Sequence, residues 1–199
     1  MTYGNNVVRA ALALVLSLLI GLPVSAAESQ QTWSLEQLMR GLSEIKSATT
    51  NYNEDQYIGI ATRPLRSSGE LVYVAPNRLE KNATMPSPQS IVIDGDKLTM
   101  REGRRSRTVS LSNHPEIGAF IESIRSTMSG DVTTLNRYYQ VALTGDADHW
   151  QLELEPTDEK VGKLVDVVRI GGSRYQLDTV EIVHTDGDRS VMTMVNSGQ

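Results

Sequence analysis

The chain of 199 residues contains no cysteine, a single phenylalanine and only 5% aromatic residues. Without cysteine, the protein has no thiol nucleophile, no thiolate metal ligand and no disulfide or dithiol redox chemistry. The shortage of aromatic side chains leaves little bulk with which to fill a core. Any apolar core or cavity is therefore expected to be lined mainly by aliphatic side chains and methionine.

Long apolar runs are also scarce, and the one that occurs lies between Ala10 and Leu22. A membrane-spanning helix needs about 20 apolar residues, so this run is short for a membrane anchor. Arg9 precedes the run, Pro23 breaks it, and the small residues Ser25–Ala27 follow. This order predicts that residues 1–27 are a secretory signal peptide, cleaved at its small-residue end.

The charge balance is acidic, with 19 Lys and Arg against 24 Asp and Glu and a net charge of −5. Such a balance argues against a general nucleic-acid-binding protein. Residues 28–199 are long enough for one domain and short for two. Export without any cysteine is typical of a protein of the bacterial periplasm.

Two segments have the spacing of amphipathic helices. The first is expected over residues 34–48, where Ser34 and Gln37 form a capping-box pattern. The second is expected to have Pro115 near its first turn and to end at Gly130. A short helical turn over residues 131–135 is expected to follow.

The rest of the chain has the pattern of many short strands separated by turns. The stretch 63–69 is expected to be a loop, and Gly171 and Gly172 a turn. Strands are expected over residues 52–61, 70–75, 78–85, 91–93, 98–101, 105–111, 138–144, 150–155, 165–170, 177–184 and 190–195. This order predicts an α+β domain in which one large, curved antiparallel sheet packs its apolar concave face on two helices. A ligand cavity remains if the helices do not fill that face.

Several segments, in this order, resemble those of a known family. Gly69–Leu79 resembles the G-x-L-x-V-x-x-P-x-x-F segment of the LolA family of periplasmic lipoprotein carriers, and Ile93–Leu98 resembles its S-D-G-K-x-L hairpin. Val74–Lys81, Pro115–Arg125 and Asp186–Ser190 are similar to a LolA-related branch of that family.

The resemblance implies a half-open antiparallel β-barrel of about 11 strands, with helices covering the concave face. It implies a periplasmic carrier that shields the acyl chains of a lipoprotein, or of another exported lipidated product, between the inner and the outer membrane. A monomer is the default expectation for such a shuttle. Its partners would be the acylated cargo, an inner-membrane donor complex and an outer-membrane acceptor. It implies no catalysis and no cofactor.

The chain departs from the family pattern at two positions. Ala75 stands where better-known carriers have an arginine that latches the helical lid, and Lys81 stands where they have an aromatic residue. Strand alternation places Lys81 on the same face as Leu79, Ala83 and Met85, where an unpaired ammonium group is costly. Lys81 is therefore expected to reach the rim, to pair with a carboxylate or to meet an anionic headgroup. The third alternative would give Lys81 the latch or headgroup role that is missing at Ala75.

The predicted ligand-binding cavity is lined by apolar side chains from the first helix, the early strands and the second helix, with Lys81 as its one charged member. Its expected residues are Leu38, Leu42, Ile58, Ile60, Leu71, Tyr73, Leu79, Lys81, Met85, Leu98, Met100, Ile117, Phe120, Ile121 and Ile124. Ile117, Phe120, Ile121 and Ile124 would equally suit an ordinary core.

A basic turn stands out in this acidic chain. Its four members are Arg101, Arg104, Arg105 and Arg107. They form either a solvated hairpin tip or a docking patch for anionic lipid headgroups or a membrane partner.

Motifs for catalysis are missing from the sequence. His114, His149 and His184 do not have the spacing of a metal site, and there is no G-x-S-x-G elbow. A carrier of apolar ligands is therefore the leading interpretation, with no metal and no enzymatic activity. The alternative is a periplasmic sensor or interaction module that has the same half-barrel fold and transports no cargo.

Overall fold

The computed structural model describes residues 33–195. The predicted signal peptide, residues 1–27, lies outside the described residues. Within residues 33–195 there are three α-helices, α2 (Leu35–Ser43), α3 (Pro115–Ser129) and α4 (Val132–Tyr138). The first six strands are β1 (Ser47–Tyr57), β2 (Leu65–Val74), β3 (Arg78–Met85), β4 (Gln89–Asp94), β5 (Lys97–Glu102) and β6 (Arg105–Ser110). The last five are β7 (Tyr139–Gly145), β8 (Trp150–Pro156), β9 (Val165–Ser173), β10 (Gln176–His184) and β11 (Arg189–Val195).

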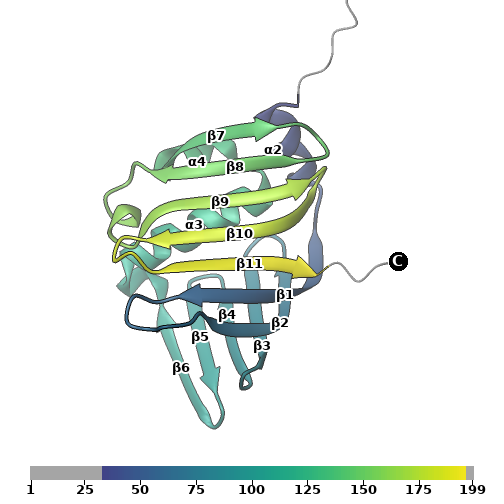
Figure 1. Ribbon diagram of the computed structural model, residues 1–199. Coiled ribbons are helices and arrows are strands. Elements are labelled where there is room, and N and C mark those ends of the chain that lie inside the picture. Colours follow the sequence, from purple (N-terminus) through teal and green to yellow (C-terminus); the bar gives the residue numbers. More distant parts are fainter. Residues whose placement is uncertain (1–32, 196–199) are drawn as a thin grey trace, which may run out of the picture. The chain divides into compact units, whose positions relative to one another are not determined.

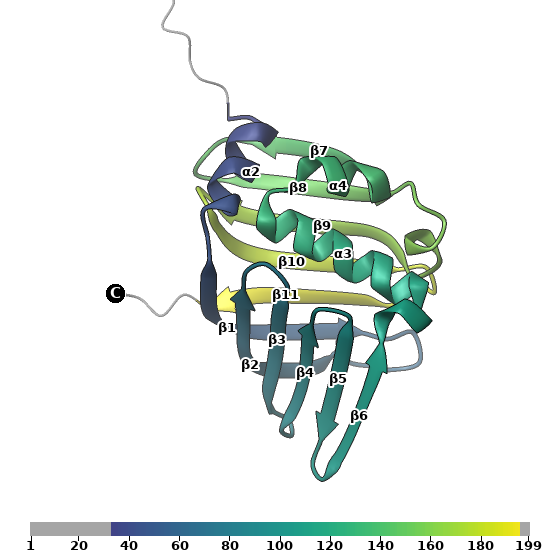
Figure 2. The same ribbon diagram turned by 180° about the vertical axis from the view of Figure 1, so that it is seen from behind.

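All eleven strands form one antiparallel sheet in the order β6-β5-β4-β3-β2-β1-β11-β10-β9-β8-β7. The first and last strands are neighbours in the middle of the sheet, where Tyr52 pairs with Met194. The two edge strands, β6 and β7, are consecutive in sequence, and the segment that joins them contains α3 and α4. This connection crosses the concave side of the sheet, so the helices lie inside an open half-barrel (Figures 1 and 2). The predicted fold class is confirmed.

The helices bury one half of the concave face. The main core cluster joins α2 and α4 to strands β7–β9, and Leu38, Leu135 and Leu152 in it have no exposed surface. A second, smaller cluster lies where Ile121 of α3 meets Ile93 and Leu98 of the β4–β5 hairpin. In the second view, α3 runs across β9 and β10, and the strands β2–β6 extend beyond it (Figure 2). No helix within residues 33–195 is long and apolar enough to cross a membrane.

Several predicted boundaries are corrected. The first helix ends at Ser43 and not at residue 48, because β1 begins at Ser47 and pairs with β2. Strand β1 ends at Tyr57, so Ile58 and Ile60 lie beyond its end. Most of the predicted loop 63–69 belongs to β2, since it pairs with the end of β1.

The predicted turn at Gly171 and Gly172 is also wrong, because both residues lie within β9. A Cβ atom on Gly172 would overlap the indole ring of Trp150 on the neighbouring strand. The glycine therefore allows close packing here and does not mark a turn. By contrast, the stop at Gly130 is confirmed, since this residue caps α3 in the left-handed conformation with φ 70°.

The predicted capping box at the start of α2 is present. The backbone N–H of Gln37 donates to Ser34 Oγ at 3.3 Å, and the backbone N–H of Ser34 donates to Gln37 Oε1 at 3.0 Å. Replacing Ser34 with alanine should lower the free energy of unfolding by about 1 kcal/mol, because one helix N–H loses its partner. Urea denaturation measures this loss, and an unchanged midpoint would show that the cap contributes nothing.

Candidate functional site: an open groove on the concave face

The concave face of β2–β6 continues past the end of its helical cover. The strand register aligns Leu71, Lys81, Ile91 and Met100 in one cross-strand row, so their side chains share a face. Ile91 and Met100 in this row are 38% and 37% exposed, and Met85 on the neighbouring strand end is 60% exposed. Apolar side chains on the inner face of a half-barrel are thus open to solvent.

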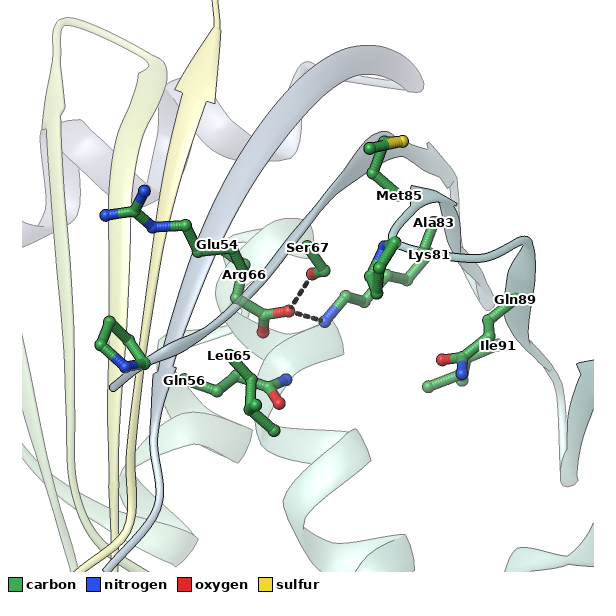
Figure 3. A pocket seen from close by; sticks show the side chains of 12 residues that line it. Glu54, Gln56, Leu65, Arg66, Ser67, Lys81, Ala83, Met85, Gln89 and Ile91 are labelled. Carbon is green, nitrogen blue, oxygen red and sulfur yellow. Dashed lines mark hydrogen bonds and ion pairs between the residues drawn. The ribbon is translucent and has the colours of Figure 1, made fainter. Parts of the chain in front are cut away.

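A cavity of about 510 Å³ opens at this place, within the size range of small-molecule binding sites (Figure 3). Its walls come from the end of β1, the start of β2, the end of β3 and the start of β4. The lining residues are Glu54, Gln56, Pro64, Leu65, Arg66, Ser67, Lys81, Ala83, Met85, Pro86, Gln89 and Ile91. We call this cavity, together with Met100, the groove.

One ion pair lies in the wall of the groove. Lys81 Nζ lies 2.6 Å from Glu54 Oε2, and Glu54 also accepts hydrogen bonds from Ser67 Oγ and Ser190 Oγ, each at 2.7 Å. The side chain of Glu54 is only 4% exposed, whereas that of Lys81 is 26% exposed. Lys81 also lies 5.3 Å from the centre of the Tyr52 ring. Of the three alternatives for Lys81, the structure therefore shows the carboxylate partner.

These contacts determine the ionisation of Glu54. Burial by itself would raise the pKa of this carboxyl group, because it disfavours the charged form. The hydrogen bond and charge of Lys81, together with the two serine hydroxyls, outweigh burial and hold the pKa of Glu54 below its usual value. Glu54 is thus ionised at neutral pH, and Lys81 presents the partly exposed side of a neutralised pair to the groove.

The structure distributes the predicted cavity residues over three environments. Lys81, Met85 and Met100 lie in the groove. The second core cluster, where α3 packs on the sheet, contains Leu79 and Leu98 of the strands and Ile117, Phe120, Ile121 and Ile124 of α3. Leu38 and Leu42 are 0% and 1% exposed in the closed core of α2 and β7–β9.

The remaining four predicted residues lie elsewhere. Leu71 is half-buried and Tyr73 is buried on the inner face of β2. Ile58 and Ile60 follow the end of β1 and do not line the groove, and Ile60 is 98% exposed. Their predicted place on the inner face is wrong because the strand on which the prediction relied stops at Tyr57.

Ten of the twelve residues that line the cavity are missing from the sequence prediction, and three of them show why. Glu54 has the same strand parity as Tyr52, which would have placed its carboxylate on the inner face. Ile91 has the same strand parity as Ile93, and the sequence predicts a strand over both residues, so this parity marks Ile91 as an inner-face residue. Leu65 lies in the stretch 63–69, for which the sequence predicts a loop, so no strand pattern marks it as an inner-face residue.

An arginine joins α3 to the strands at the other end of the inner face. Arg125 Nη2 donates to the backbone oxygen of Gly95 at 2.6 Å and to that of Asn77 at 3.1 Å, and the side chain is only 12% exposed. Gly95 lies in the β4–β5 turn and Asn77 in the β2–β3 turn. The helix is thus fixed to two hairpin turns by an arginine of its own, close in the fold to Ala75.

The fold and the groove define a class of protein: a half-barrel whose inner face is partly covered by helices and partly open, with an apolar binding surface. The sequence matches the model of the family described as outer membrane lipoprotein carrier protein LolA-like over residues 26–197. The chain therefore belongs to this LolA-like family. That description names a carrier and not an enzyme, as the sequence predicts.

Distant structural likenesses accompany the family match, and no curated protein matches the chain. A LolA superfamily protein from Nitrosomonas europaea is 14% identical, and the match covers 82% of this chain and 92% of that protein, with a TM-score of 0.41. A DUF1329 family protein from Desulfovibrio piger is 9% identical, with coverages of 81% and 89% and a TM-score of 0.45. The MucA/MucB complex from Pseudomonas aeruginosa is 11% identical, with coverages of 80% and 55% and a TM-score of 0.40. The family assignment rests on the family model alone.

Proposed function

We propose that this protein is a periplasmic carrier that holds acyl chains of a lipoprotein, or of another lipidated product, in the groove during transfer between two membranes. The observation that carries the proposal is the open half of the concave face, where apolar side chains of β2–β5 remain exposed beside a cavity of about 510 Å³. Membership of a LolA-like family supports the same function. Export by the predicted signal peptide would bring the protein to the compartment that this function requires.

Acyl-chain binding in such a groove needs few specific contacts. Each CH₂ group removed from water contributes about 0.8 kcal/mol, so a long chain gains affinity mainly from its length. Met85 and Met100 suit this task because the unbranched thioether side chain adapts to ligands of different shape. The cargo would also complete the packing of an inner face that has few aromatic side chains.

Binding of a fluorescent fatty acid tests the groove directly. Ile91→Ser should weaken binding about 10-fold, because the acyl chain loses contact with the Ile91 side chain on the inner face. Val74→Ser is the matched control, since Val74 is 39% exposed, as Ile91 is 38%, but lies on the opposite face of the sheet. We expect this control to bind as the wild type does. Equal affinities for the two variants would contradict the proposal, and complete lack of binding would favour a sensor or interaction module.

The groove offers one polar contact for a cargo headgroup. Glu54 uses one N–H of the Lys81 ammonium, and the exposed part of that group faces the cavity. We expect an anionic headgroup to interact with Lys81 at the cost of competing with Glu54. A Glu54→Leu, Lys81→Met double variant separates this role from stability, because it removes both charges together. It should bind a fatty acid less tightly than the wild type and bind a neutral acyl ester equally well. Unchanged binding of both probes would exclude a headgroup role for Lys81.

A further inference from the structure

The basic turn lies beside the groove. It is the tip of the β5–β6 hairpin, which projects away from the three helices (Figures 1 and 2). All four arginines, Arg101, Arg104, Arg105 and Arg107, are exposed. None of them forms an ion pair within the described residues 33–195, whereas Arg78, Arg169 and Arg189 each pair with a carboxylate.

The strand register places part of the basic turn on the groove side of the sheet. Arg107 pairs with Met100, which pairs with Ile91, which pairs with Lys81. The apolar side chains of Ile91 and Met100 therefore lie between the cationic side chains of Lys81 and Arg107 on the concave face. Met85, the last residue of β3 before the neighbouring β3–β4 turn, lines the cavity and is 60% exposed.

The charge of the molecule is strongly asymmetric. Four arginines and Glu102 give residues 101–107 a net charge of +3, so the remaining residues carry −8 of the total of −5. An acidic protein with one basic end is oriented near an anionic surface, with that end foremost. Here that end is the one at which the groove opens.

We infer that the basic turn docks the protein on an anionic phospholipid surface, with Met85 and the groove turned toward the bilayer. Guanidinium groups would contact lipid phosphates, with which they form paired hydrogen bonds. The exposed apolar side chains beside them would reach the level at which acyl chains begin. In this orientation an acyl chain could pass between bilayer and groove without crossing open water. This use of the surface rests on the carrier function proposed above, but membrane docking is measured without any cargo.

Vesicle flotation tests the docking. The wild type should bind vesicles that contain phosphatidylglycerol, fail to bind vesicles of phosphatidylcholine alone and dissociate at high salt. Screening explains the salt effect, since the Debye length falls from about 10 Å at 0.1 M to about 3 Å at 1 M salt. Each arginine contributes about 1 kcal/mol near an anionic surface, so changing all four to glutamine should weaken binding by on the order of 1,000-fold.

A matched variant controls for net charge. Arg40, Arg137, Lys160 and Lys163 are exposed, lie outside the basic turn and form no ion pair within residues 33–195. Changing these four to glutamine removes the same total charge, and we expect most of the vesicle binding to remain. Equal losses in the two variants would overturn the proposal, as would a wild type that ignores anionic vesicles at low salt. The second result would favour an acidic protein partner or a solvated turn.

The absence of cysteine makes the orientation measurable. A single Ser87→Cys substitution in the β3–β4 turn allows an environment-sensitive dye to be attached next to the groove. Its emission should shift toward that of an apolar medium when anionic vesicles are added. A dye at Asn136→Cys, on the exposed side of α4, should not respond. A stronger response at position 136 than at position 87 would contradict the proposed orientation.

Discussion

Lys81→Met is expected to lower the free energy of unfolding at pH 7 by about 3 kcal/mol or more, because it leaves the buried carboxylate of Glu54 without its counterion. The two serine hydroxyls that remain cannot compensate for a missing charge in a site that is 4% exposed. Urea denaturation of the two proteins measures the difference. Glu54→Gln should cost less, since the partly exposed Lys81 can turn toward water.

The stability lost in Lys81→Met should be largest at neutral pH and smaller in acid. In the wild type the pKa of Glu54 is lowered, so its contribution to stability is present at neutral pH and is lost as the pH falls through the folded-state pKa. In Lys81→Met, burial is no longer opposed by the lysine and should raise this pKa, so protonation relieves the variant. The difference in stability should therefore begin to shrink as the pH falls through the raised pKa of Glu54 in the variant, and should keep shrinking down to the lowered pKa of Glu54 in the wild type. A difference that stays constant from pH 7 to pH 3.5 would contradict this account.

A double-mutant cycle separates the pair from its surroundings. Removing both charges in Glu54→Leu, Lys81→Met should restore most of the stability lost in Lys81→Met, because neutral side chains can replace an ion pair without leaving a buried charge. The losses of the single variants Glu54→Leu and Lys81→Met should consequently not add. Additive losses would show that Glu54 and Lys81 stabilise the fold independently.

Arg125→Met is expected to release α3 from the turns that it joins, with a loss of about 2–3 kcal/mol in stability, because two backbone oxygens lose a charged donor. Amide exchange should accelerate in α3, above all near Ala119 and Ile121, while β8 and β9 exchange as in the wild type. A bound fluorescent fatty acid should also dissociate faster, since α3 packs on strands β4 and β5, which carry part of the groove. These measurements distinguish a local release from general destabilisation.

Two further variants make this prediction specific. Arg125→Lys keeps the charge but lacks the planar guanidinium group, and we expect it to recover only part of the lost protection from amide exchange. Arg137→Met removes an exposed arginine from α4 and should leave the exchange of α3 unchanged. Equal exchange in Arg125→Met and the wild type would show that the two hydrogen bonds do not fix the helix.

The sequence identifies most elements because their patterns are local. The strand at Arg78–Met85 is predicted with its observed bounds, since its alternation is regular and Pro76 and Pro86 lie just outside it. The first helix is predicted to run too far because Ile45 continues its apolar spacing. Ile45 does pack against the core, but it does so after the helix has ended.

The groove is harder to predict, because its extent depends on where the helices stop covering the sheet. Ile121 and Met100 have the same apolar character in sequence, but only Ile121 is buried where α3 packs on the sheet. The partner of Lys81 lies 27 positions earlier in the chain, and only the pairing of β1 with β2 and β2 with β3 brings the two together. Strand parity alone did predict that Lys81 faces inward, and a carboxylate partner was one of its three alternatives.

Native mass spectrometry of the protein purified from its natural source tests the central proposal most directly. If the groove carries acyl chains, the intact protein should have a population whose mass exceeds that of the chain by a lipid or an acylated peptide. Ile91→Ser, expressed in the same cells, should show less of this population, and Val74→Ser should show as much as the wild type. Protein that is empty in all three preparations, and that binds no added fatty acid, would contradict the carrier function.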